Sequence, residues 1–254
     1  MKKLSTGEAL LLMLMLAVAA VCVRLGIWQL DRLGQRLQKN AEITARLADP
    51  ILEFPPDIPR EHQSYRRVSA AGRFDRDQAI LLENQPYNDQ AGFHLLVPFI
   101  VQDGGQALLV DRGWIDFEKG LGADPRQLAG DTIGSLTIEG VLLPSQREPV
   151  FAFLADKPPA PGEPPLLSWR VVNLEGIQGQ VPYPLYPLYL AQTGPLPALE
   201  DEPLPLFEPD LSNGPHLSYA IQWFAFAAIS LFGGTALLRR HRIRRIAGEQ
   251  EQEI

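Results

Sequence analysis

Two long apolar stretches lie at opposite ends of the chain and enclose a polar, proline-rich middle of roughly 185 residues. The second stretch, Leu217 to Leu238, carries no formal charge, and as a helix it reaches roughly 33 Å, enough to cross a hydrocarbon core. The first, Ala9 to Val23, is shorter, but residues 25–28 lengthen it if Arg24 extends its guanidinium to the headgroups. This pattern predicts a membrane-anchored hairpin with a folded domain between its anchors.

The middle of the chain has the pattern of β-structure, because short apolar or alternating runs recur between Gly, Pro, Asn and Asp residues. Asp103-Gly104-Gly105 predicts a tight hairpin connection, and the proline-rich stretches 144–165 and 182–209 predict loops. The predicted strands are Tyr65–Phe74, Gln78–Glu83, Phe93–Val101, Gln106–Ile115, Leu136–Leu143, Trp169–Val172 and Leu188–Ala191.

A helical period continues from the first anchor through Leu30 to Leu47, with an apolar stripe at Leu30, Leu33, Leu37 and Ala41. The predicted fold class is therefore a membrane α+β protein, in which two transmembrane helices flank an exported, β-rich antiparallel domain. The expected boundaries are 1–8 for a cytoplasmic N-terminus, 9–28 for the first transmembrane helix, 29–216 for the exported domain, 217–238 for the second helix and 239–254 for a cytoplasmic basic tail.

The orientation follows from the five arginines between Arg239 and Arg245, because such a cluster favours the cytoplasmic side. The first anchor argues the other way, since four cations between Arg24 and Lys39 follow it and only Lys2 and Lys3 precede it. The C-terminal cluster is given more weight in assigning the orientation, because a long loop such as the one after the first anchor translocates largely regardless of its charge. The expected localisation is the bacterial-type inner (cytoplasmic) membrane, multi-pass, with both termini cytoplasmic.

A cleaved signal peptide is the alternative for the first anchor, and Lys2-Lys3, the apolar run and the alanines at 17–20 suit one. Cys22 raises a lipoprotein as a further alternative, although Val21 before it is a poor lipobox residue. No clean cleavage site follows the apolar run, so retention of the helix is preferred.

Composition narrows the function classes. A net charge of −7 over 254 residues, without a basic face, excludes a nucleic-acid binder. The single cysteine, Cys22, excludes intrachain disulfides, paired-thiol sites and C-x-x-C-H haem attachment, and it argues against a thiol copper chaperone. The sequence has no Gly-rich phosphate loop, His-x-x-x-His pair or Gly-x-Ser-x-Gly elbow, so it predicts no enzyme.

The candidate chemistry lies at the outer end of the second anchor. His216, Tyr219 and Trp223 share one helical face, and an antiparallel hairpin brings Trp28 and Gln29 to about the same depth. An imidazole beside aromatic rings can ligate haem iron, because the macrocycle needs a flat apolar slot and one axial nitrogen. The structural alternative is that the aromatic residues anchor a membrane interface and that His216 caps its helix.

Other polar and small residues receive structural interpretations. Gln29 and Gln222 are predicted to form interhelical hydrogen bonds, and Gly233-Gly234 to allow close packing. In the segment Asp111-Arg112-Gly113-Trp114, a turn with Arg112 bonded to backbone carbonyls is preferred over an arginine that binds a propionate or a partner. Histidines without a companion ligand at metal spacing are interpreted as ordinary polar residues: His62, His94 and His241.

Five blocks along nearly the whole chain resemble the surfeit locus protein 1 family. They are Leu25-Gly26-Ile27-Trp28-Gln29-Leu30-Asp31-Arg32, Tyr65-Arg66-Arg67-Val68 with Gly72-Arg73-Phe74-Asp75, Gly92-Phe93-His94-Leu95-Leu96-Val97-Pro98-Phe99, Val110-Asp111-Arg112-Gly113-Trp114, and His216-Leu217-Ser218-Tyr219-Ala220-Ile221-Gln222-Trp223-Phe224. Five blocks in order are far more specific than any one. Val97 departs from the family pattern, where a hydroxyl residue often precedes Pro-Phe, and the proline-rich loop after Pro144 is unusually long.

The resemblance implies a non-enzymatic assembly factor for haem–copper cytochrome c oxidase, which helps haem a reach the catalytic subunit. The implied partners are that subunit, its assembly machinery and the lipid bilayer, with no nucleic acid. A histidine that opens the second helix is a proposed haem ligand in that family, and His216 occupies the matching place, so it is the candidate metal ligand here. Two other classes stay open: a cofactor-free scaffold for an immature membrane subunit, and a membrane-bound hydrolase.

Overall fold

The computed structural model describes residues 5–102, 104–130, 134–146, 155–160, 162–193 and 203–251; beyond Arg240 it describes the side chain of Ile243 only. The chain forms two compact units. The hairpin unit contains Met1–Glu42 and Asp210–Ile254, and the β unit contains Ile43–Pro209. Asp103 of the predicted hairpin connection, and parts of both predicted proline-rich loops, lie outside the described residues.

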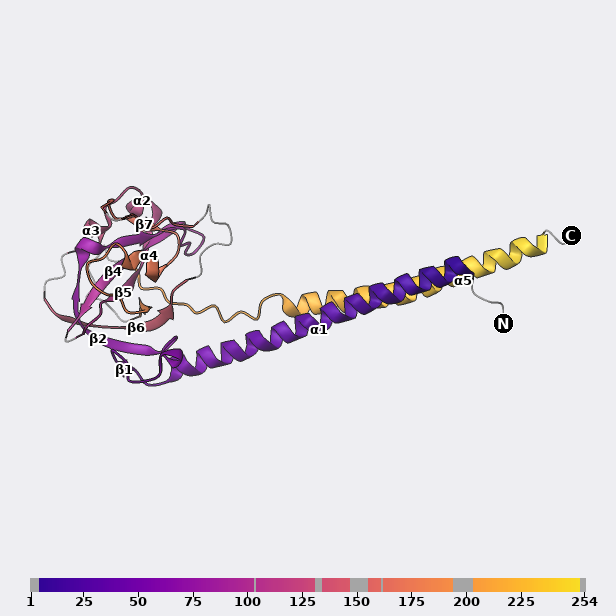
Figure 1. Ribbon diagram of the computed structural model, residues 1–254, viewed down its shortest axis with the longest axis horizontal. Helices are drawn as coiled ribbons and strands as arrows, with labels where there is room; N and C mark the ends of the chain where they lie inside the picture. The colour runs from indigo at the N-terminus through magenta and orange to yellow at the C-terminus, as the bar shows by residue number, and fades with distance from the viewer. Residues whose placement is uncertain are drawn as a thin grey trace. The chain divides into compact units, whose positions relative to one another are not determined.

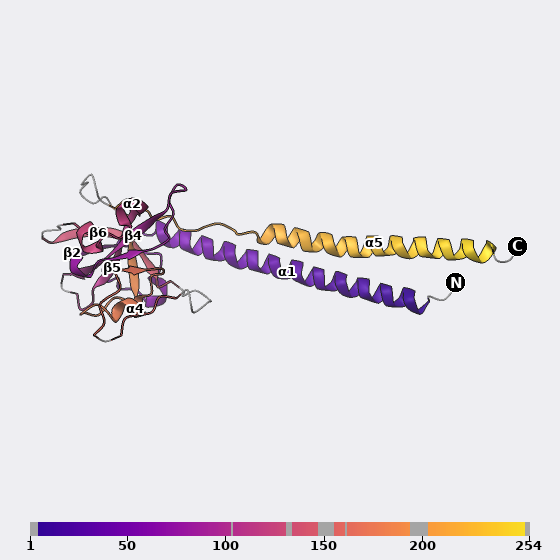
Figure 2. The ribbon, with the colours of Figure 1, turned by 90° about the horizontal axis from the view of Figure 1, so that it is seen from above.

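Two long helices form the hairpin unit. Helix α1 (Thr6–Ala48) is continuous, which confirms that the helical period runs on past the first anchor, and α5 (His216–Glu251) follows the β unit in sequence. Both views of the ribbon draw them side by side and antiparallel (Figures 1 and 2). Each contains a window apolar enough to span a membrane, with mean hydropathy of 2.6 and 1.6, and most of each window is exposed. That exposure argues against core helices of a soluble protein and favours membrane association.

The predicted apolar stripe is wrong at Leu30, Leu37 and Ala41, whereas Leu33 is half-buried as predicted. Leu30 and Leu37 are 42% and 46% exposed, and Ala41 is exposed as well. The inward positions that follow Leu33 are Arg36 and Asn40, whose side chains hydrogen-bond to the chain that precedes α5. This face of α1 packs against backbone carbonyl groups, and polar side chains donate hydrogen bonds to them.

The β unit is built on one eight-stranded sheet with the order β1-β2-β6-β8-β5-β4-β3-β7. Because β2 pairs with both β6 and β4, strands β2, β6, β8, β5 and β4 close into a ring. All seven predicted strands are confirmed to within a few residues, and β1 is additional. The bounds are β1 (Leu52–Glu53), β2 (Arg67–Phe74), β3 (Ile80–Leu82), β4 (Gly92–Val101), β5 (Leu108–Asp116), β6 (Leu136–Pro144), β7 (Ser168–Trp169) and β8 (Leu188–Gln192).

The sheet is mixed, so the prediction of an antiparallel domain is confirmed only in part. Three pairs run parallel: β1–β2, β3–β7 and β5–β8. Parallel neighbours need a long connection between them, and the chain between β5 and β8 supplies one of more than 70 residues, from Phe117 to Pro187. The hairpin pair β4–β5 is antiparallel, as its short connection predicts.

Alternation along the ring strands makes two cores. On β4, Leu95, Val97 and Phe99 belong to one buried cluster, whereas Leu96 belongs to a second cluster on the other face, around Trp169. Short helices cover parts of the sheet, with aspartate or asparagine caps on the three α-helical ones. Their bounds are η1 (Arg60–His62), η2 (Arg76–Gln78), α2 (Phe117–Gly120), α3 (Pro125–Leu128) and α4 (Leu174–Gln178).

The first prediction tests this core. Phe99 is fully buried, so Phe99→Ala should lower the free energy of unfolding of the β unit by about 3–5 kcal/mol. Phe117→Ala is the matched control, because Phe117 is 42% exposed and its stacking on Phe93 accounts for about 1 kcal/mol. Amide hydrogen exchange of β5, measured on the full chain in detergent, reports both values. Equal loss of protection in the two variants would contradict the placement of Phe99 in the core.

Candidate functional site

The two long helices meet along a regular seam. Buried or half-buried positions on α1 recur at spacings of three and four residues: Met15, Ala19, Cys22, Gly26, Gln29, Leu33, Arg36 and Asn40. On α5 the corresponding series is His216, Ala220, Trp223, Ala227, Ser230 and Gly234. A seven-residue repeat of this kind is the signature of coiled-coil-like packing. The seam therefore determines which residues of the two helices meet.

Small residues let the helices approach closely in the apolar part of the seam. A Cβ on Gly234 would lie 1.8 Å from Met15 Cε, and one on Gly26 would lie 2.7 Å from the Phe224 ring. Ser230 Oγ also donates to the Met15 backbone carbonyl, at 3.1 Å. The prediction of close packing is thus confirmed at Gly234, whereas Gly233 faces open space.

The seam joins Gln29 to His216 by a hydrogen bond. Nδ1 of His216 lies 2.9 Å from Oε1 of Gln29, across 187 residues of sequence. Gln29 is only 9% exposed, while His216 is half-buried at the first turn of α5. The interhelical role predicted for Gln29 is confirmed. Gln222, in contrast, is exposed on α5, and no hydrogen bond joins it to the described part of α1.

The segment that leads into α5 is fixed to the same face of α1. Arg36 donates from Nε to the Ser212 carbonyl at 2.8 Å, and its Nη2 forms an ion pair with Asp210 at 2.6 Å. Nδ2 of Asn40 donates to the Leu211 carbonyl at 2.6 Å. Arg36 and Asn40 follow Gln29 by seven and eleven residues, so all three side chains leave one face of the helix. We call the contacts of Arg36 and Asn40 with residues 210–212 the clamp. Sequence reasoning missed it, although the spacing of Arg36 and Asn40 from Gln29 was a signal for it.

Asp210 accepts hydrogen bonds that stabilise its charged form. Its pKa is lowered from the usual value for an aspartate, first by hydrogen bonds from Ser212 and then by the charge of Arg36. The Ser212 backbone N–H donates to Oδ1 at 3.0 Å. The carboxylate is therefore ionised at neutral pH, and it accepts from Ser212 and pairs with Arg36 at the same time.

The predicted aromatic residues take different positions around His216. Trp28 and Tyr219 are 44% and 45% exposed, and Trp28 carries the Arg32 guanidinium 5.7 Å from its ring centroid. Trp223 is half-buried and packs on the small-residue cluster of the seam. The structure therefore brings Gln29 into contact with His216, sets Trp223 into the seam, and leaves the rings of Trp28 and Tyr219 on the outer surface of the hairpin.

In the β unit, the segment 111–114 forms part of β5 rather than a turn. Arg112 is buried, donates from Nη1 to the Ala129 carbonyl at 2.6 Å and lies 4.8 Å from the Phe74 ring centroid. The predicted carbonyl contact is thus confirmed. Asp111 Oδ2 lies 2.8 Å from Nδ1 of His94, a pairing that sequence reasoning missed. His62 is exposed, and the side chain of His241 lies outside the described residues.

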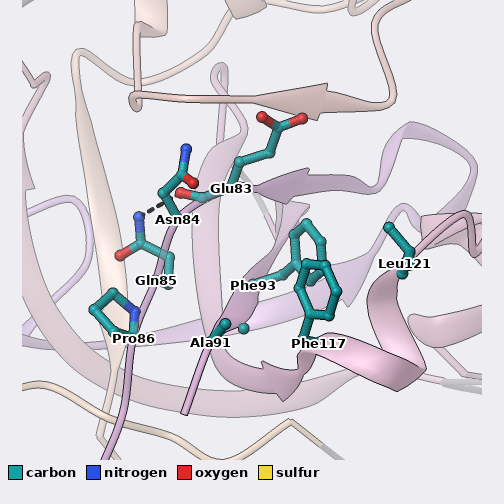
Figure 3. Close-up of a pocket in the computed structure, with 9 residues that line it drawn as sticks. Glu83, Asn84, Gln85, Pro86, Ala91, Phe93, Phe117 and Leu121 are labelled. Atoms are coloured by element: carbon teal, nitrogen blue, oxygen red, sulfur yellow. Dashed lines mark hydrogen bonds between the residues drawn. The ribbon is translucent and has the colours of Figure 1, made fainter. Parts of the chain in front are cut away.

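A cavity of about 520 Å³ opens on the β unit beside the stacked rings of Phe93 and Phe117 (Figure 3). Leu121, Ala91 and Pro86 add apolar surface, and Glu83 lies at its rim. Over the described residues, no group of three His, Cys, Asp or Glu side chains is placed to hold a metal ion.

Comparison with known proteins identifies the family. The model of the SURF1 family matches residues 16–228, which include most of both arms of the hairpin seam and the whole β unit. This chain belongs to the SURF1 family. The resemblance seen in the five sequence blocks is thereby confirmed.

Relatives of this SURF1-family protein occur in bacteria and eukaryotes. An uncharacterised SURF1-like protein of Mycobacterium tuberculosis (strain H37Rv) is 29% identical over 91% of this chain and 83% of its own length. The cytochrome oxidase assembly protein SHY1 of Saccharomyces cerevisiae is 34% identical over 49% of this chain and 32% of its own. Surfeit locus protein 1 of Mus musculus is 26% identical over 53% of this chain and 49% of its own.

The second prediction concerns Asp210. Ser212→Ala removes the hydroxyl donor and should raise the Asp210 pKa toward its usual value, by more than Arg36→Gln does, because Ser212 is the larger cause. A lowered pKa stabilises the clamp above about pH 4 and loses its effect as pH falls through the pKa of the folded state. Carboxyl ¹³C NMR of the full chain in detergent measures the titration. An Asp210 pKa unchanged by both substitutions would contradict the assignment.

Proposed function

We propose that this protein is a membrane-anchored, non-enzymatic assembly factor for haem–copper cytochrome c oxidase, which holds haem a transiently beside His216 and helps its delivery to the catalytic subunit. Family membership supports the assembly role, since a yeast relative is named a cytochrome oxidase assembly protein. One observation carries the haem part of the proposal. The 2.9 Å contact between Gln29 and His216 holds an imidazole at the first turn of α5, against the buried face of α1.

The donor set fits haem better than a bare metal ion. A zinc or copper site draws on several protein ligands, and none of the described residues form a cluster of three donors. Haem brings four equatorial nitrogens of its own and needs from the protein an axial ligand and apolar surface. His216 offers the nitrogen, and Trp28 and Tyr219 offer exposed ring faces on the same unit.

Different residues of the chain have different roles in holding haem. Haem a, as cargo, supplies an iron atom that accepts an axial nitrogen. His216 presents Nε2, since Nδ1 is occupied by Gln29. Trp223 is packed into the seam about two turns after His216, against Ala19, Cys22 and Ala227. A single neutral imidazole is a modest anchor, which suits a carrier that must release what it holds.

The same proposal includes the topology. Both long helices cross a bacterial-type inner membrane, the basic residues from Arg239 onward stay cytoplasmic, and the β unit lies on the periplasmic side. The helices are then the spans 9–28 and 217–238, and the β unit offers the surface for the oxidase catalytic subunit and its assembly machinery. The first helix must be retained rather than cleaved, because Met15, Ala19 and Cys22, which pack against α5, belong to the part that cleavage would remove.

A cofactor-free scaffold is the second candidate, and the clamp is the observation that favours it. Arg36 and Asn40 secure the hairpin without any cargo, and in that setting the Gln29–His216 bond is another interhelical fastener. The two candidate functions differ in whether the purified protein binds haem at all.

The third prediction separates these candidates. Protein purified from cells that co-express haem a synthesis enzymes should show a Soret band, and His216→Ala should abolish or shift it because the axial nitrogen is gone. His62→Ala is the matched control, since His62 is exposed and lies in the β unit. A colourless wild-type protein would favour the scaffold, whereas a haem spectrum that is identical in His216→Ala and wild type would contradict His216 as the ligand.

The fourth prediction concerns the oxidase. Deleting the gene should lower the haem a content per catalytic subunit, measured from the reduced-minus-oxidised spectrum of isolated membranes against an immunoblot of the subunit. A wild-type gene copy should restore the ratio, and a His216→Ala copy should restore it only in part. Unchanged haem occupancy in the deletion strain would contradict the assembly role.

A further inference from the structure

We propose that Gln29 is a positioning residue for His216: its side-chain oxygen holds the imidazole in the Nδ1–H tautomer and so presents an unprotonated Nε2 to the cargo. This inference rests on the proposed haem custody for its purpose. It concerns the chain's own residues, however, and can be measured without haem.

The argument begins with imidazole chemistry. A neutral ring has one nitrogen that donates a proton and one that carries a lone pair, and only the lone pair can bind a metal. The oxygen of the Gln29 amide accepts hydrogen bonds and donates none, so a ring nitrogen 2.9 Å from it must carry the proton. The lone pair is then on Nε2. Metal-binding histidines in proteins are commonly fixed by such a bond from the nitrogen that does not bind the metal.

The position of Gln29 makes this bond persistent. The side chain is 9% exposed and lies on the inward stripe of α1, where water has little access to it. A buried amide without its partner would be costly, so the contact is favoured whether or not cargo is bound. Within the described chain, Gln29 is the hydrogen-bond partner of His216.

The chain before His216 is also held against α1. Arg36 and Asn40 hold residues 210–212 against α1, which sets where α5 starts relative to Gln29. Gly214 has a φ of +65°, and a Cβ there would sit 3.5 Å from Nε2 of His216. The missing side chain leaves the space beside Nε2 open. Nε2, which carries the lone pair when Nδ1 donates to Gln29, therefore has no side chain of residue 214 beside it.

The first arm of the test measures the tautomer. The full chain is labelled with ¹⁵N-histidine and studied in detergent without haem at about pH 8.5, where imidazole is neutral. Loss of one resonance pair in His216→Ala assigns that residue among the four histidines. We expect the Nδ1–H tautomer in wild type and a mixture in Gln29→Leu. Gln29→Glu, which keeps an acceptor oxygen, should retain the tautomer. An Nε2–H tautomer in wild type would overturn the proposal.

The second arm measures haem affinity of the same proteins by titration of the Soret band. Gln29→Leu should weaken binding about 10- to 100-fold, as loss of such supporting bonds does at metal sites, and Gln29→Glu should restore it. Gln222→Leu, the same substitution at an exposed glutamine of α5, should bind as wild type does. Equal affinity of wild type and Gln29→Leu, with binding still dependent on His216, would overturn the inference.

The two arms keep this inference distinct from the function on which it rests. If the wild-type protein binds no haem, or binds it independently of His216, haem custody fails while the tautomer measurement still decides the role of Gln29. If haem binding depends on His216 but neither tautomer nor affinity responds to Gln29→Leu, custody stands and the positioning role fails. Rescue by Gln29→Glu separates positioning from a loss of helix packing, because only the acceptor oxygen is restored.

Discussion

The seam between α1 and α5 is the constraint on which the candidate site depends. Gln29 and His216, which meet there, are 187 residues apart in sequence, so only helix packing brings them together. Small residues in the apolar part, with Gly234 against Met15 and Gly26 against Phe224, allow little freedom to slide. A shift of one residue along α1 would turn Gln29 by about 100° and remove it from His216. The close contacts in one half of the seam therefore set the polar contact in the other.

The character of the seam changes along α1, and the change has a physical cause. In its first half the inward positions are small or apolar, such as Ala19 and Cys22, because they face the apolar part of α5. In its second half they become Gln29, Arg36 and Asn40, since they face the start of α5 and the backbone before it. Exposed backbone carbonyls need donors, and long polar side chains on a helix supply them. One continuous helix can thus serve a lipid-facing and a polar environment without a break.

The sequence predicts the strands of the β unit well, because alternation along runs such as Gly92–Val101 directly records two buried faces. It does not reveal that β5 pairs in parallel with β8, since that pairing depends on a long return of the chain. The Leu30–Leu37 stripe misled for a related reason. Apolar periodicity marks burial only when apolar partners exist, and the partner of this part of α1 is a polar segment more than 170 residues away. The proximity of Gln29 and His216 was predictable, because two antiparallel helices that span the same membrane place the end of the first span and the start of the second at the same depth.

Transient custody requires a site that holds its cargo without trapping it, and the histidines of this chain are distributed accordingly. His94 lies in the β unit with its Nδ1 committed to Asp111 in a largely buried pair, so it is already engaged in the structure of the sheet. His62 is exposed on a short helix of that unit. On the proposed function, His216 alone among these three faces haem, as a single axial ligand. Permanent haem proteins gain affinity from an enclosing pocket or a second axial ligand, whereas a surface seam with one imidazole favours exchange. The strength of that one bond then depends on how well the ring is held, which is why the support of His216 by Gln29 matters more here than at a closed site.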